Sequence, residues 1–100
     1  MTLALGERRL CAAIIYKAVV DAQADGNDRA AAVTWLASRQ AEQWFDLLDM
    51  SQSSFLVAAG WADWAEEVLT SDLSEKQRHV IKTTLTYLSG LRARKESWDA

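Results

Sequence analysis

The side chains that most often carry out catalysis are few in this chain and stand apart from one another. His79 is the only histidine and Cys11 the only cysteine, so neither a histidine-based metal triad nor a site of several cysteines can form. Local spacing places no base beside Cys11 or beside Ser51, Ser53 and Ser54, as a nucleophile would require. The four glycines lie at least 20 residues apart, which excludes the glycine-rich phosphate-binding motifs. We therefore expect no catalytic residue, no metal site and no cofactor, and a protein that acts by binding.

Carboxylates, in contrast, are frequent and are spaced at helical intervals. A helix places residues three or four positions apart on one face. Three sets have this spacing: Asp21, Asp25 and Asp28; Glu42, Asp46 and Asp49; and Asp63, Glu66 and Glu67. Like charges at such intervals destabilise an isolated helix by about 0.2–0.5 kcal/mol per pair, and no lysine or arginine lies between Gln40 and Glu75. The sequence therefore predicts acidic helical faces.

The basic residues are concentrated near the end of the chain: Lys76, Arg78, Lys82, Arg92, Arg94 and Lys95. If the fold separates the two kinds of charge, one surface is strongly negative and attracts basic clefts, including nucleic-acid channels. The carboxylates expected to bind a partner are Asp21, Asp25, Asp28, Glu42, Asp46, Asp49, Asp63 and Glu67. Two simpler interpretations stay open: the carboxylates serve only solubility, or tertiary contacts with Arg8, Arg29 or Arg39 neutralise them.

Length and composition indicate one helical domain over residues 1–100. Half of the residues are hydrophobic, proline is absent and glycine is scarce, all of which favour helices. The net charge of −3 argues against a general nucleic-acid-binding protein. The sequence shows no signal-peptide pattern, and no apolar run approaches the roughly 20 residues of a membrane span. We expect a cytoplasmic protein with no membrane contact and no direct nucleic-acid contact.

Hydrophobic periodicity predicts a compact, irregular bundle of five to six helices, with two longer terminal helices and short helices between them. The first helix is expected from about residues 3–7 to about residue 24, with Leu10, Ile14, Ala18 and Ala22 on its apolar stripe. Short helices follow after Asp28 and over about residues 39–48, 52–59 and 62–69. The last helix begins near residue 75, and a tail of about residues 93–100 is expected to fray.

Polar residues and glycines mark the expected ends of these helices. Side-chain oxygens of Ser and Asp accept hydrogen bonds from free amides at a helix start, and left-handed Gly or Asn ends a helix. The expected N-caps are Asp28, Ser38, Ser51 and, for the last helix, either Asp72 or Ser74, of which Ser74 has capping-box spacing with Gln77. The expected helix stops are Gly26-Asn27 and Gly60.

Tryptophan is unusually frequent, with five residues. Trp35, Trp44 and Trp61 fall at apolar positions of the expected helices, which favours the core. Trp64 lies three residues after Trp61, so we expect it to be partly exposed and available to a partner. Trp98, in the polar tail, is either disordered or a contact residue.

Residues 47–55 resemble the turn and second-helix start of helix-turn-helix proteins, with Leu47-Leu48 before the turn and Ser51-Gln52 after it. Two residues depart from that family, because Asp49 replaces the turn glycine and Phe45 a small alanine. Affinity for duplex DNA depends largely on Lys and Arg contacts to phosphate. A recognition helix from Ser51 to Gly60 brings none, so we expect the turn without its DNA-reading function.

A second resemblance covers roughly residues 8–55. The pattern Leu10-Cys11-Ala12-Ala13 with Ile15, Ala18, Val19 and Asp21-Ala22, followed by Trp35-Leu36-x-Ser38 and Trp44-Phe45-Asp46-Leu47, resembles small proteins carried by phages and prophages. Some acidic, helical phage proteins of this size are anti-CRISPR proteins, which bind a CRISPR effector at its crRNA- or DNA-binding surface.

That resemblance implies an inhibitor that acts in the cytoplasm of an infected bacterial host. It would bind a type I, Cascade-like CRISPR effector complex and block target-DNA binding, and we expect it to be a monomer. Two alternatives stay open. One is a helix-turn-helix transcriptional regulator whose basic surface is the last helix, and the other is a phage structural or adaptor protein.

Overall fold

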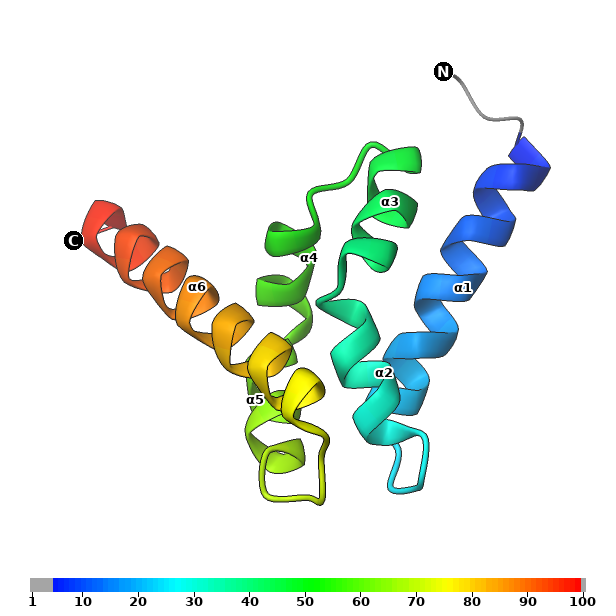
Figure 1. Ribbon diagram of the computed structural model, residues 1–100. Coiled ribbons are helices and arrows are strands. Elements are labelled where there is room, and N and C mark those ends of the chain that lie inside the picture. The colour runs from blue at the N-terminus through cyan, green and yellow to red at the C-terminus, as the bar shows by residue number, and fades with distance from the viewer. Residues whose placement is uncertain (1–4, 100) are drawn as a thin grey trace.

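Six helices joined by short connections make up the chain from residue 5 to residue 99, and no strand occurs within this range (Figure 1). The computed structural model describes the backbone of residues 5–99 and the side chains of residues 5–91. The helices are α1 (Leu5–Gln23), α2 (Arg29–Leu36), α3 (Arg39–Leu47), α4 (Gln52–Ala59), α5 (Trp61–Val68) and α6 (Glu75–Asp99). The expected all-α bundle, with long terminal helices and short helices between them, is confirmed.

The chain crosses the molecule four times (Figure 1). In that view α1 descends, α2 and α3 ascend, α4 and α5 descend, and α6 ascends and leans outward. The α1–α2 and α5–α6 connections therefore share one end of the molecule, and the α3–α4 turn lies at the opposite end. With extents of 40 × 39 × 21 Å the molecule is flat. The helices α1 and α6 form its two long edges, so each leaves one side without a neighbouring helix.

Every helix contributes side chains to a single core. The largest fully buried side chains are Trp61, Phe45, Leu36, Leu56, Ile81, Leu88 and Val33. The prediction that Trp61 lies in the core is confirmed, and its indole Nε1 donates to the Val33 carbonyl over 2.9 Å. This bond joins α5 to α2, the helix that also packs on α1, α3 and α6. Cys11 is buried on α1, as expected.

Three expected caps are present. The Ser38 hydroxyl accepts from the Ala41 amide over 3.2 Å, and the Ser51 hydroxyl accepts from the Ser54 amide over 3.3 Å. At the start of α6, the Gln77 amide donates to the Ser74 hydroxyl and the Ser74 amide donates to the Gln77 side chain. Gly60 ends α4 in the left-handed conformation, with φ of 78°. These ends are set by local hydrogen bonds, which is why the sequence predicts them.

The expected connection between α1 and α2 is wrong in its details. Asp28 occupies the residue before α2 but has helical dihedral angles and makes no capping hydrogen bond. Neither Gly26 nor Asn27 is left-handed. The free carbonyl of Ala22, at the end of α1, instead accepts from Nε of Arg29 over 3.0 Å. A side chain from the next helix thus replaces the expected glycine stop.

The expected burial of Leu10 is also wrong, because its side chain is 61% exposed. The buried side of α1 carries Cys11, Ile15 and Ala22. Apolar residues occur on all sides of α1, so periodicity alone could not decide which side faces the core.

The last helix passes through Gly90 and continues to Asp99. The sequence predicts fraying after about residue 93. The side chains of residues 92–100, Trp98 among them, lie outside the described residues.

Candidate functional site

The eight predicted carboxylates do not form one surface. Four of them gather around the α1–α2 connection: Asp21, Asp25, Asp28 and, from the end of α5, Glu67. Three others lie on α3 and its following turn: Glu42, Asp46 and Asp49. Asp63 stands by itself in the first turn of α5. The first group lies at the α1–α2 connection and the second extends along α3 to the α3–α4 turn, at the opposite end of the molecule (Figure 1).

Cations partly neutralise the group around the α1–α2 connection. Nζ of Lys17 lies 3.0 Å from Asp21, and this hydrogen bond and the carboxylate charge raise the pKa of Lys17. The Arg29 guanidinium pairs with both Asp25 and Glu67, and its side chain is only 18% exposed. The alternative left open by the sequence, neutralisation by Arg29, therefore holds for two of the carboxylates. Asp21 and Asp28 also line a hollow of about 430 Å³ between α1 and α2.

The second group has no such partners, and we call Glu42, Asp46 and Asp49 the α3 acidic edge. All three side chains are exposed, and none of them makes an ion pair with any residue in the described part of the chain. Glu42 and Asp46 stand at i and i+4 on α3, and no basic residue occupies the last turn of this helix. Negative charges at a helix carboxyl end oppose its dipole. Asp46 and Asp49 are therefore unfavourably placed at the carboxyl end of α3, whereas Glu42 lies in the first turn, where a negative charge is favourable.

The α3–α4 turn has the backbone of the motif it resembles but not its chemistry. Asp49 has φ of 57°, so it adopts the left-handed conformation that the motif's glycine would take. Helix α4, which follows, carries no Lys or Arg. The Gln52 side chain donates to the carbonyls of Leu36 and Ser38 over 2.9 and 3.0 Å. Its amide therefore holds α4 against the α2–α3 junction.

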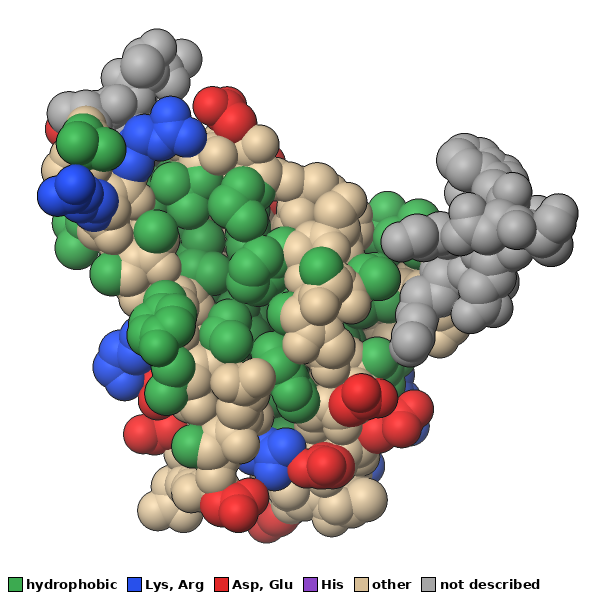
Figure 2. All heavy atoms as spheres, turned by 180° about the vertical axis from the view of Figure 1, so that it is seen from behind, with side chains coloured by type: hydrophobic (Ala, Val, Ile, Leu, Met, Phe, Trp, Pro, Cys, Tyr) green, Lys and Arg blue, Asp and Glu red, His purple; other side chains and the backbone are tan. Residues whose placement is uncertain are grey.

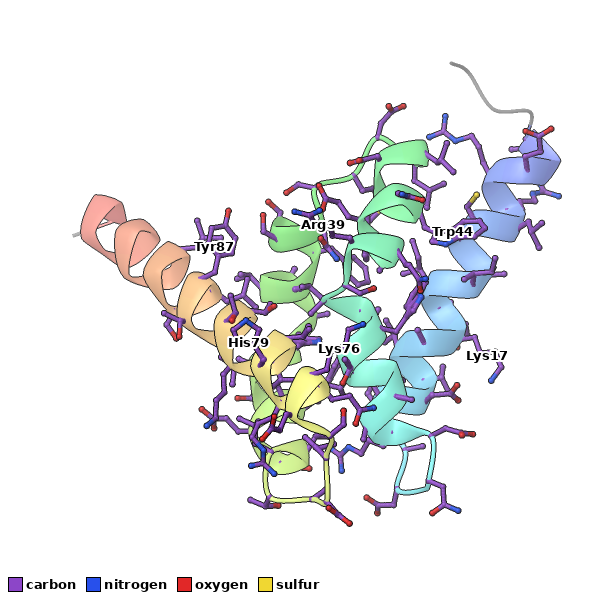
Figure 3. The ribbon with its side chains drawn as sticks, viewed as in Figure 1. Lys17, Arg39, Trp44, Lys76, His79 and Tyr87 are labelled. Atoms are coloured by element: carbon purple, nitrogen blue, oxygen red, sulfur yellow. The ribbon has the colours of Figure 1, made fainter. Side chains whose placement is uncertain are left out.

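A groove runs along α6 and faces the junction of α2, α3 and α4. Its wider end, about 940 Å³, is lined by Arg39, Lys76 and His79 and by no acidic residue. Figure 3 shows these side chains between α6 and the α2–α3 column, with Tyr87 farther along α6. At the far end, Tyr87 shares a hollow with Glu42 and Asp46. Sequence reasoning missed this groove because Arg39 and the α6 residues meet only through tertiary packing.

Aromatic side chains offer less contact area than the sequence predicts. Trp64 is half-buried and packs on the core, so only part of its ring is available to a partner. Trp44 lies between α3 and α1 (Figure 3) and is half-buried as well. Figure 2 shows that hydrophobic side chains nevertheless gather on the rear face, between α1 and the middle of the molecule.

The described residues hold no arrangement for metal binding, since no three His, Cys, Asp or Glu side chains come together among them. His79 is exposed in the groove along α6. Within residues 5–99, no helix is both long and apolar enough to cross a bilayer. Comparisons with protein-family models, curated proteins and solved structures find no match to this chain.

Proposed function

We propose that this chain is a non-catalytic inhibitor that docks its α3 acidic edge onto a basic, nucleic-acid-binding surface of a host protein complex. The proposal depends on the exposure of Glu42, Asp46 and Asp49 and on their lack of neutralising partners. All three are exposed, and none has an ion-pair partner among the described residues. They stand on helix α3 and on the hydrogen-bonded turn that ends it.

The electrostatics of this edge favour a basic partner. Glu42 and Asp46 repel each other at i and i+4, and Asp46 and Asp49 oppose the dipole at the carboxyl end of α3. Arginine or lysine side chains of a partner would relieve both effects and would accelerate association by steering. The resemblance of residues 8–55 to small phage and prophage proteins supports the choice of partner, a type I, Cascade-like CRISPR effector.

The test measures binding of target DNA by a purified Cascade-like effector loaded with crRNA. The variant carries Glu42→Gln, Asp46→Asn and Asp49→Asn, and Asn at position 49 tolerates the left-handed backbone. We expect the wild-type chain to abolish the DNA-bound band in a gel-shift assay. The triple variant should require at least about tenfold more protein, which corresponds to about 1.4 kcal/mol of lost binding energy.

A matched control removes the same charge elsewhere through Glu7→Gln, Glu66→Gln and Asp72→Asn, all at exposed positions. This control should inhibit as well as the wild type. If the wild-type chain leaves target binding unchanged, the choice of effector is wrong. If both triple variants inhibit equally, the α3 acidic edge is not the contact.

A second candidate function is DNA binding as a transcriptional regulator. Two observations favour it: the left-handed turn at Asp49 and the three basic side chains Arg39, Lys76 and His79 in one groove. A gel shift with genomic duplex fragments at moderate salt would detect it. In that case Arg39→Ala with Lys76→Ala should weaken binding, whereas neutralising the α3 acidic edge should strengthen it. No shift at any protein concentration would exclude this function.

A further inference from the structure

Three adjoining hollows form one groove between α6 and the helices α2, α3 and α4. The widest hollow, of about 940 Å³, shares Thr83 and Thr84 with a middle hollow of about 240 Å³. The middle hollow in turn shares Gln52 and Tyr87 with the far hollow, of about 350 Å³. A ligand can therefore extend along α6 from Lys76 at the wide end to Tyr87 at the far end (Figure 3).

Basic and acidic side chains line opposite ends of this groove. Arg39, Lys76 and His79 line the wide end, without any carboxylate among the described residues. Glu42 and Asp46 line the far end, where the described residues include no lysine or arginine. All five residues are exposed, and none makes an ion pair within the described part of the chain. The charge at both ends is therefore available to a ligand.

The two ends keep their charges apart. Arg39 and Glu42 stand at i and i+3 on α3, a spacing at which a salt bridge can form, but no ion pair joins them. On α6, His79 lines the wide end and Tyr87 the far end, and eight helical positions correspond to about 12 Å. A ligand that carries both signs of charge can therefore reach both ends at once.

Between its charged ends the groove is neutral. Leu56 and Leu88 contribute apolar surface there, and Thr83 and Thr84 contribute hydroxyl groups. A hydroxyl group both donates and accepts hydrogen bonds, which suits the N–H and C=O groups of a peptide main chain. The middle of the groove is therefore suited to an extended main chain with small apolar side chains.

The two signs of charge limit the class of ligand. A nucleic-acid strand carries a phosphate at every nucleotide, so Glu42 and Asp46 repel part of it. A purely basic segment is repelled in the same way by Arg39 and Lys76. We propose that the groove along α6 binds an extended peptide segment of a partner protein, with acidic side chains at the wide end and basic side chains at the far end.

The length of the groove sets the spacing of charges in this peptide. An extended chain rises about 3.3 Å per residue, so the roughly 12 Å between the two ends corresponds to about four residues. Tyr87 is 57% exposed, and its ring can lie against an arginine of the peptide at the far end. Because Glu42 and Asp46 belong to the α3 acidic edge, this assignment rests on the proposed function and specifies it. The basic surface of the partner then includes a segment that also carries acidic residues.

Phage display of random peptides on the immobilised full chain tests the proposal. Peptides of about ten residues are long enough to span the groove. We expect the enriched sequences to carry acidic and basic residues about four positions apart, in one constant order along the peptide. No enrichment, or enrichment of peptides that lack this pattern, would overturn the proposal.

Charge reversal at the wide end identifies the place of binding. The best enriched peptide is synthesised with a fluorescent label, and its affinity is measured by fluorescence anisotropy. Arg39→Glu with Lys76→Glu should weaken binding at least about tenfold. Both substitutions place a carboxylate in the first turn of a helix, where it is favourable, so the fold should persist.

A matched control makes the same change of net charge on α1, through Arg8→Glu with Arg9→Glu at exposed positions. Neither residue lines the groove, so the affinity for the peptide should be nearly unchanged at moderate salt. Equal weakening by the two pairs of substitutions would contradict binding in the groove.

The effector gel-shift assay separates the peptide groove from the proposed function. Arg39→Glu with Lys76→Glu leaves the α3 acidic edge intact but should inhibit at least about tenfold less than the wild type. If this variant inhibits as well as the wild type or better, while neutralising the α3 acidic edge still relieves inhibition, the edge is the contact and the groove is not. If the wild-type chain enriches peptides of the expected pattern but leaves target-DNA binding unchanged, the groove is a peptide site and the choice of effector is wrong.

Discussion

Asp49 shows at the scale of one residue how the backbone holds a carboxylate at the end of α3. The amides of Leu48 and Met50 both donate to the Phe45 carbonyl, over 3.0 and 2.9 Å, and the Asp49 amide donates to the Asp46 carbonyl. These hydrogen bonds can close α3 only if the Asp49 backbone is left-handed, and its φ of 57° lies in that region. Asp adopts the left-handed conformation more readily than most residues do. Because Asp has a Cβ, however, this conformation is less favourable for Asp than for Gly.

We therefore predict a difference in stability between two substitutions at position 49. Asp49→Gly removes both the Cβ and the charge that opposes the α3 dipole, and should raise the free energy of unfolding by about 0.5–1 kcal/mol. Asp49→Ala removes the same charge but keeps the Cβ and loses the local polar side chain, so its free energy of unfolding should be about 1–2 kcal/mol below that of Asp49→Gly. Urea denaturation measures both. Equal stability of the two variants would show that the left-handed backbone at this position is not strained.

At the scale of the helical element, the Gln52 side chain holds α4 in place. Gln52 stands where a recognition helix would begin in the motif that the sequence resembles, but its contacts are within the protein. The Gln52 amide donates to two carbonyls at the α2–α3 junction, Leu36 and Ser38. The Leu36 carbonyl lies at the end of α2, where intrahelical donors run out, and the Ser38 carbonyl also accepts from the Glu42 amide over 3.1 Å. The polar group at the start of α4 is therefore structural, which agrees with the absence of cations on that helix.

Gln52→Ala should accordingly reduce stability. It leaves two partly buried carbonyls without this donor, and we expect the free energy of unfolding to fall by about 1–2 kcal/mol. Gln43→Ala is the matched control, because Gln43 is exposed on the neighbouring helix α3 and should change stability by less than about 0.5 kcal/mol. Thermal or urea unfolding followed by circular dichroism compares them. Equal effects of the two substitutions would refute the structural role of Gln52.

The helical elements also show which features a sequence can predict. Ser38, Ser51 and Ser74 make capping bonds to amides three residues ahead, so a local pattern is sufficient. Arg29, in contrast, joins Ala22 to Glu67, which lies 38 residues along the chain. Arg29 takes the place of the helix stop expected at Gly26, and it neutralises Asp25. Neither role can be predicted from the spacing of residues along the chain. The division of the carboxylates into two groups depends on such long-range contacts.

The same limit applies to the outer side of α1. Apolar residues on every side of this helix predict that it is helical but do not show which side meets the core. Only the packing of α1 on α2 and α3 leaves Tyr16 and Val20 exposed. The groove along α6, where Arg39 meets Lys76 and His79, likewise appears only when the four passes of the chain are assembled.

At the scale of the whole molecule, two surfaces of opposite character lie on different parts of a flat body. The α3 acidic edge is charged and lies beside the α3–α4 turn, whereas the outer side of α1, at one edge of the molecule, carries exposed apolar side chains such as Tyr16 and Val20 (Figure 1). Docking through the α3 acidic edge would therefore leave the outer side of α1 free.

Binding through the α3 acidic edge should accordingly be sensitive to salt. Between about 0.1 M and about 1 M salt the Debye length shrinks from about 10 Å to about 3 Å. Binding of the wild-type chain to a crRNA-loaded effector, measured by biolayer interferometry, should weaken at least about tenfold over this range, mainly through slower association. Effector binding that is insensitive to salt over this range would contradict an electrostatic contact at the α3 acidic edge.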